Sequence, residues 1–187
     1  MKKYYYLRFR PTANIDYRYL LAFYDLAEYN SEKKVFDTIH YQSVRVLAES
    51  LNVSSNTVNR IFDNPAYADF MCVDKSTKTI TLYNTFVRGQ TEQFVRLTAD
   101  EVKLIREVDT NLFAKYLIYV KYYCGYTNNK TDFTAQQFLT ACGYSTKSNS
   151  TLDTISTYNG LLVERGFITI QKYRDELGHT RNRYIYN

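Results

Sequence analysis

The sequence predicts an α+β protein, mostly helical, built from tandem winged helix-turn-helix modules that each carry a β-hairpin wing. Residues 43–64 contain two short helical patterns that are separated at Asn52. Residues 68–84 then form two β-branched and aromatic runs around a polar turn, which is the pattern of a hairpin. A pair of short helices followed by a hairpin predicts one such module in the first half of the chain.

The second half of the chain repeats this order of elements. Helical patterns at 136–142 and 152–164 are separated by Gly143, and a second hairpin with two basic arms follows at 167–186. We therefore expect an internal duplication. The expected domains are an N-terminal module of residues 1–92 and a C-terminal module of residues 93–187.

Further elements are expected around the two helix pairs. Residues 14–30 have the apolar spacing of a helix, and residues 35–41 are β-branched and aromatic enough for a short strand. The run Thr98-Ala-Asp-Glu101 has the spacing of a capping box, which predicts that a helix starts there. Residues 111–123 predict a strongly apolar helix that is closed by Gly125.

The first helix pair meets the three demands of a helix-turn-helix. Ala48 is the small residue where the two helices cross, and Asn52 tolerates left-handed backbone in the turn, where Gly is usual. Ser54 is placed to cap the second helix. The buried face is expected to consist of Leu47, Leu51, Val53, Val58 and Ile61.

The outer side of the second helix in this pair carries hydrogen-bonding side chains that suit DNA. Arg can address guanine, Asn can address adenine, and the free amides at a helix start can bind a phosphate. Lys in the hairpin turn suits contact with the DNA backbone or minor groove. The alternative is an ordinary polar helix surface. The DNA-binding residues predicted for this module are Ser54, Ser55, Asn56, Asn59, Arg60, Lys75 and Lys78.

The second module matches this pattern less well. Leu139 stands where a small crossing residue is expected, and residues 147–150 form an insertion that is compatible with a phosphate-binding loop or a plain surface loop. The hairpin is more basic than the first, although Asp175 and Glu176 offset part of that charge. Solvated charges on edge strands would look the same. The candidate DNA-binding residues here are Lys147, Ser148, Asn149, Lys172, Arg174, Arg181 and Arg183.

Composition restricts the other function classes. The formal net charge of +5 permits phosphate contact without demonstrating it. The three cysteines lack metal-site or redox spacing, so we expect them to be reduced, buried and structural. With only two histidines, a three-histidine zinc centre cannot be built. The sequence has no apolar stretch of the length and position that would indicate a signal peptide or a membrane span. We therefore expect a cytoplasmic protein without a membrane partner.

An enzymatic function would require a tyrosine nucleophile acting on DNA or a set of acidic metal ligands. The acidic residues are scattered over predicted helix surfaces, and no tyrosine is tied to a cluster of His, Arg and Lys that would activate it. We therefore expect a protein that is not an enzyme and that needs neither a cofactor nor a metal ion.

The chain resembles the winged-helix replication initiators of plasmids and phages, including phage replisome organisers. The resemblance rests on residues 46–62, on Phe94-Val-Arg-Leu-Thr98 with Ala114-Lys-Tyr-Leu-Ile-Tyr119, and on residues 152–168. It implies binding of double-stranded origin DNA, a homodimer formed through one module, and recruitment of host replication proteins. Asn52 in place of Gly and the second helix pair depart from the family pattern.

Two alternatives use the same scaffold. A transcriptional repressor, for example of its own operon, is equally compatible with a helix-turn-helix. A phage-encoded inhibitor of a host nucleic-acid enzyme, as some anti-CRISPR proteins are, would instead bind a host defence protein, since one fold serves many functions. Tight binding to such a partner with weak, salt-sensitive DNA binding would favour the inhibitor.

Overall fold

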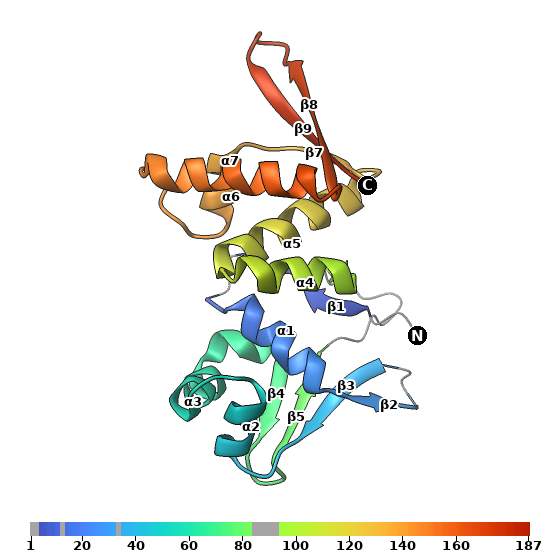
Figure 1. Cartoon of the computed structure of the whole chain (residues 1–187), viewed down its shortest axis with the longest axis vertical. Helices are drawn as coiled ribbons and strands as arrows, with labels where there is room; N and C mark the ends of the chain where they lie inside the picture. Colours follow the sequence, from blue (N-terminus) through green and yellow to red (C-terminus); the bar gives the residue numbers. More distant parts are fainter. Residues whose placement is uncertain (1–3, 12–13, 33–34, 84–93) are drawn as a thin grey trace. The chain divides into compact units, whose positions relative to one another are not determined.

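The computed structural model describes residues 4–11, 14–32, 35–83 and 94–187 (Figure 1). Over these residues the protein is an α+β structure of helices and small antiparallel sheets, which confirms the expected class at that level. The chain divides into two compact units. Unit 1 contains the described residues of 1–8 and 14–109, and unit 2 contains those of 9–13 and 110–187.

Unit 1 contains a four-stranded antiparallel sheet in the order β2-β3-β5-β4 and a separate two-stranded sheet, β1-β6. Along the chain, α1 precedes the strands of the larger sheet, α2, α3 and η1 come between β3 and β4, and α4 follows β6 (Figure 1). The elements are β1 (Tyr5–Arg8), α1 (Tyr17–Leu26), β2 (Glu28–Asn30), β3 (Val35–His40), α2 (Val44–Ser50), α3 (Ser55–Asp63), the 3-10 helix η1 (Pro65–Asp69), β4 (Met71–Asp74), β5 (Thr79–Leu82), β6 (Phe94–Leu97) and α4 (Ala99–Val108).

Unit 2 contains a three-stranded antiparallel sheet in the order β7-β9-β8. Its long hairpin, β8 and β9, extends away from the helices of the unit (Figure 1). The elements are α5 (Asn111–Tyr126), β7 (Lys130–Asp132), α6 (Ala135–Ala141), α7 (Asn149–Glu164), β8 (Ile168–Arg174) and β9 (Thr180–Tyr186). None of the described helices combines the length and the apolar character that crossing a membrane requires.

Both units contain the same succession of helix, strand, two helices and hairpin, as the sequence predicts. The strand ahead of each helix pair lies beside the second arm of the following hairpin: Thr38 of β3 is opposite Thr81 of β5, and Thr131 of β7 is opposite Tyr184 of β9. The two units therefore share the pairing of three strands, β3-β5-β4 and β7-β9-β8, to which unit 1 adds β2.

Strand pairing accounts for where the described residues divide between the two units. The predicted boundary between residues 92 and 93 lies outside the described residues. Among the described residues, the units divide after Asp109. Strand β6 pairs antiparallel with β1, with Leu97 opposite Tyr5, and α4 begins directly after β6. This pairing joins residues 94–109 to unit 1.

Two helix ends also differ from expectation. The helix predicted over 14–30 ends at Leu26, and residues 28–30 form β2, which pairs with β3. Gly125 lies inside α5 and does not close it. The turn after α5 is made by Asn128 and Asn129, which adopt left-handed φ angles of 53° and 64°. The capping box at Thr98 and Glu101 is confirmed.

The cysteines correct one prediction. Cys124 and Cys142 are buried and free, as expected, and burial raises their thiol pKa values to about 11 and about 12. Cys72 is free but exposed. It lies on β4 directly after the buried Met71, so the alternation of side chains along a strand turns it to solvent.

Candidate nucleic-acid interface

The turn between α2 and α3 has the geometry that the sequence predicts. Ala48 is 2% exposed, and its carbonyl accepts a hydrogen bond of 2.9 Å from the Val53 amide. Asn52 adopts a left-handed φ of 55°. Because this residue reverses the chain direction within one turn, α3 begins only a few residues after α2 ends. As predicted, Ala48 is therefore the small buried residue between the two helices, and Asn52 is the left-handed residue of the turn.

The role of Asn52 predicts a stability difference between two variants. Asn52→Ala should lower the free energy of unfolding by about 1 kcal/mol, because an Ala side chain disfavours left-handed backbone. Asn52→Gly should not lower it, because Gly adopts this φ without steric cost. Asn52 is exposed, so packing does not confound the comparison. Urea unfolding followed by circular dichroism measures both, and equal losses would contradict the assignment.

The start of α3 is capped as expected. The Ser54 hydroxyl accepts a hydrogen bond of 3.1 Å from the Thr57 amide and lies 2.9 Å from the Thr57 hydroxyl. Ser55 is half-buried, which corrects its predicted place on the exposed side of α3. Leu51 and Val53 are half-buried and not fully buried as predicted, whereas the predicted burial of Leu47, Val58 and Ile61 is confirmed.

The outer side of α3 presents three predicted residues together. Asn56, Asn59 and Arg60 are all exposed. Their spacing of three and four residues places them on one side of a helix. Within the described part of the chain, no hydrogen bond or ion pair engages their side chains. Two amides and one guanidinium are therefore available to an external ligand.

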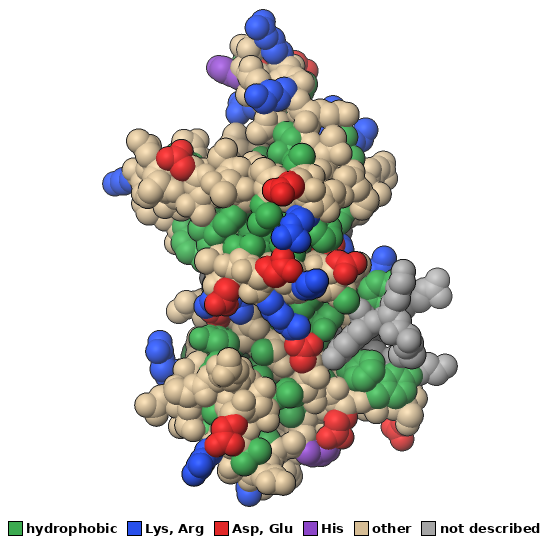
Figure 2. All heavy atoms as spheres, viewed as in Figure 1, with side chains coloured by type: hydrophobic (Ala, Val, Ile, Leu, Met, Phe, Trp, Pro, Cys, Tyr) green, Lys and Arg blue, Asp and Glu red, His purple; other side chains and the backbone are tan. Residues whose placement is uncertain are grey.

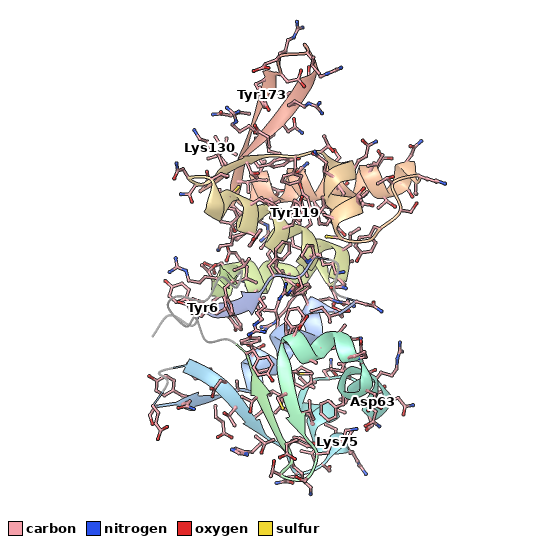
Figure 3. All side chains as sticks on the ribbon, turned by 180° about the vertical axis from the view of Figure 1, so that it is seen from behind. Tyr6, Asp63, Lys75, Tyr119, Lys130 and Tyr173 are labelled. Atoms are coloured by element: carbon pink, nitrogen blue, oxygen red, sulfur yellow. The ribbon has the colours of Figure 1, made fainter. Side chains whose placement is uncertain are left out.

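The two lysines in the turn of the first hairpin differ in their contacts, and Figure 3 labels Lys75 and its partner Asp63. Lys75 Nζ lies 3.0 Å from a carboxylate oxygen of Asp63, the last residue of α3, and both side chains are exposed. Lys78 adopts a left-handed φ of 54°, and its carbonyl accepts a hydrogen bond from the Tyr41 amide. Its ammonium group has no ion-pair partner among the described residues. The charge of Lys75 is thus offset, and that of Lys78 is not.

Asp74 orders this turn. Its carboxylate accepts hydrogen bonds from the amides of Ser76 and Thr77 and from the Ser76 hydroxyl. These bonds, with the Ser76 hydroxyl first, lower the pKa of Asp74 to about 2. The sequence identifies this segment as a turn, but it does not indicate that Asp63 engages Lys75, since the two residues belong to different elements.

In unit 2, the turn between α6 and α7 repeats that of unit 1. Gly143 has a φ of 74°, and the Tyr144 amide donates to the Leu139 carbonyl at 2.8 Å, as Val53 does to Ala48. Leu139 is fully buried. The structure therefore accommodates a large residue at the crossing position.

The start of α7 differs from that of α3. Ser148 is its N-cap residue but makes no side-chain capping bond, and its hydroxyl lies 2.7 Å from that of Ser150. Lys147 and Asn149 are exposed beside it. The sixteen residues of α7 include no Lys or Arg, and the exposed Asp153 adds negative charge. The outer side of α7 thus lacks the cation that Arg60 supplies on α3.

Two arginines of the second hairpin are engaged within unit 2. Arg183 donates two hydrogen bonds of 3.0 Å to Asp132, and its guanidinium lies 4.5 Å from the centre of the Tyr173 ring. Tyr173 donates a further bond to Asp132. The hydrogen bond from Arg183 is the main cause that lowers the pKa of Asp132. Arg181 Nε lies 2.8 Å from a carboxylate oxygen of Asp175, so Asp175 offsets part of the positive charge of the hairpin, as predicted.

Lys172 and Arg174 are the two predicted hairpin residues that stay exposed and unengaged by side chains of the described residues. Strand pairing places Lys172 opposite Asn182 and Arg174 opposite Thr180. Lys and Arg side chains are visible along the projecting hairpin in Figure 2. The sequence missed Asp132 as a partner of Arg183, because the two meet only through the pairing of β7 with β9.

Comparisons with known proteins add no relative. No protein-family model matches the chain, and no curated protein matches its sequence. Among the described residues, no group of three or more His, Cys, Asp or Glu side chains is arranged to hold a metal ion. The chemistry available at the two candidate surfaces is hydrogen bonding by amides and hydroxyls together with attraction of anions.

Proposed function

We propose that the protein binds double-stranded DNA without catalysing a reaction, and that unit 1 is the winged helix-turn-helix module that does so. The observation that carries this proposal is the set of Asn56, Asn59 and Arg60 on the outer side of α3, exposed and unengaged by the described residues. The same side-chain types read base edges in the major groove. No cofactor or metal ion takes part in this function.

In this proposal α3 enters the major groove. Arg60 makes a bidentate contact with a guanine, while Asn56 or Asn59 contacts an adenine. The free amides at the start of α3 bind a phosphate. They remain available because, among the amides of the described residues, only that of Thr57 donates a hydrogen bond to the Ser54 hydroxyl. Lys78 in the hairpin turn supplies a backbone contact.

The tandem arrangement is part of the same proposal. Unit 2 repeats the helix pair, the interhelical turn and the pairing of three strands found in unit 1, which supports a second winged module. We assign sequence reading to unit 1, because α7 has no cationic residue and two arginines of its hairpin are paired with carboxylates. The biological role that follows is binding of an origin or an operator in a phage or mobile element, as a homodimer or with a host replication protein.

A selection experiment tests the proposed function. The purified full chain is mixed with random duplex DNA, bound sequences are recovered, and the affinity for the selected site is measured by fluorescence anisotropy. We expect a preferred site that contains guanine and adenine. Recovery of no preferred sequence, together with tight capture of a host nucleic-acid enzyme, would contradict the proposal in favour of the inhibitor alternative.

The two hairpin lysines should differ in their effect on duplex binding. Lys78→Ala should lower affinity evenly across sequences and reduce the salt slope by about 0.9, the value for one phosphate contact. Lys75→Ala should have a smaller effect, because Asp63 already offsets its charge. Asp63→Asn should strengthen binding by releasing Lys75. Anisotropy titrations at several salt concentrations measure all three, and a larger effect for Lys75 than for Lys78 would refute the assignment.

A further inference from the structure

A cavity of about 250 Å³ opens between α7 and β9 in unit 2. It runs along one side of α7, over the start of α6 and across four residues of β9, which are Thr180, Arg181, Asn182 and Tyr184. The buried rings of Phe133 and Tyr184, stacked with centroids 4.3 Å apart, form part of its wall. The cavity is therefore a groove between a helix and a hairpin, and its base is fixed by core residues.

The groove is lined by polar side chains that the described part of the chain leaves available. Ser156 of α7 and Thr180 and Asn182 of β9 make no side-chain hydrogen bond to any described residue. Asn159 is held in place, because it accepts a 2.5 Å bond from the Tyr116 hydroxyl and donates a 3.4 Å bond to the Tyr184 hydroxyl. Hydroxyl and amide groups of this kind can bind phosphate oxygens and base edges.

Positive charge lies beside the groove. Asn182 and Thr180 line it, and the register places Lys172 and Arg174 directly opposite them on the same face of the hairpin. Arg183 lies on the other face, where Asp132 pairs with it. The groove face thus carries the two hairpin cations that no carboxylate among the described residues offsets.

Size and charge distinguish the possible ligands. The cavity is somewhat smaller than the roughly 300 Å³ at which pockets for drug-sized ligands begin, so it holds about one base or one sugar-phosphate unit. A duplex cannot enter such a groove, and the cation-free outer side of α7 does not favour docking into a major groove. A single strand can place one nucleotide in the groove and its neighbouring phosphates on the cations.

We propose that unit 2 binds single-stranded nucleic acid in the groove between α7 and β9. Ser156, Asn159 and Asn182 contact one nucleotide, and Lys172 and Arg174 contact the flanking phosphates. This function is separate from duplex binding by α3 and uses different residues, so either can fail without the other.

The test measures binding of the full chain to a fluorescein-labelled oligodeoxythymidine of about 12 nucleotides, a length within the usual range of single-strand sites. The double variant Lys172→Ala and Arg174→Ala should weaken binding about tenfold and reduce the salt slope by about 1.4, the value for two phosphate contacts on a single strand. Ser156→Phe, which fills the groove from an exposed position, should weaken binding at unchanged net charge.

Matched control variants distinguish binding in the groove from attraction by net positive charge and from binding by unit 1. Gln171→Ala changes an exposed residue on the other face of β8, and Lys130→Ala removes an exposed cation on β7; neither should weaken binding of the oligonucleotide. Arg60→Ala should also leave it unchanged. Thermal melts by circular dichroism establish that each variant is folded.

Three results would overturn the proposal. The first is binding of the oligonucleotide by folded groove variants as tightly as by the wild type. The second is equal loss in the Lys130→Ala control, which would indicate attraction by net charge alone. The third is groove-dependent binding of polyglutamate without binding of the oligonucleotide, which would assign the groove to an acidic protein segment.

Discussion

Arg60→Ala is expected to weaken binding of the selected duplex by about 5- to 150-fold, which corresponds to the 1–3 kcal/mol of a bidentate contact with guanine. It should also relax the preference for guanine at one position of the site. The reason is that Arg60 is exposed on α3 without a partner among the described residues, so no internal contact is lost when it is truncated.

Two further variants separate base reading from charge. Arg60→Lys keeps the positive charge but loses the planar fork, so it should retain weak, even binding and still lose the preference for guanine. Lys103→Ala removes an exposed cation on α4 of the same unit and should leave the preference intact. If Arg60→Lys keeps the full preference, Arg60 contacts a phosphate and not a base.

Phe138→Ala should destabilise the protein by about 3–5 kcal/mol, the usual cost of removing a large buried ring. Phe138 of α6 is fully buried, and its ring centroid lies 4.9 Å from that of Tyr116 and 5.1 Å from that of Tyr119. Truncation would leave both tyrosines of α5 facing a void. The loss is read from urea unfolding followed by circular dichroism.

A surface variant calibrates this result. Val163→Ala removes methyl groups from a side chain on α7 that is 45% exposed, so it should change the free energy of unfolding by less than about 0.5 kcal/mol. A loss for Phe138→Ala no larger than that of Val163→Ala would show that α6 and α5 do not pack as described.

The features that could be predicted from sequence depend on local chemistry. Asn52 and Gly143 indicate the two turns because few residues tolerate left-handed backbone. Ser54 and Thr98 indicate helix starts because their hydroxyls satisfy free amides. Alternating and helical periodicity locate the strands and helices around them. Each signal lies within a few residues of the feature that it predicts.

The features that were missed depend on contacts between distant residues. Residues 94–109 belong to unit 1 through the pairing of β6 with β1, which are far apart in the sequence. The neutralisation of Arg183 by Asp132 requires β7 to lie beside β9. A count of basic residues treats Arg183 and Lys172 alike, whereas the register places them on opposite faces of the hairpin. Lys172 therefore lies on the face that borders the groove, whereas Arg183 is held by Asp132 on the other face.

An NMR titration of the isotopically labelled full chain with the selected duplex tests the central claim most directly. Contact through α3 predicts that the largest changes in amide chemical shift fall on residues 54–60 and on the hairpin turn around Lys78. Changes confined to other surfaces of the protein, or no changes at saturating duplex, would contradict the assignment of α3 as the DNA-reading helix.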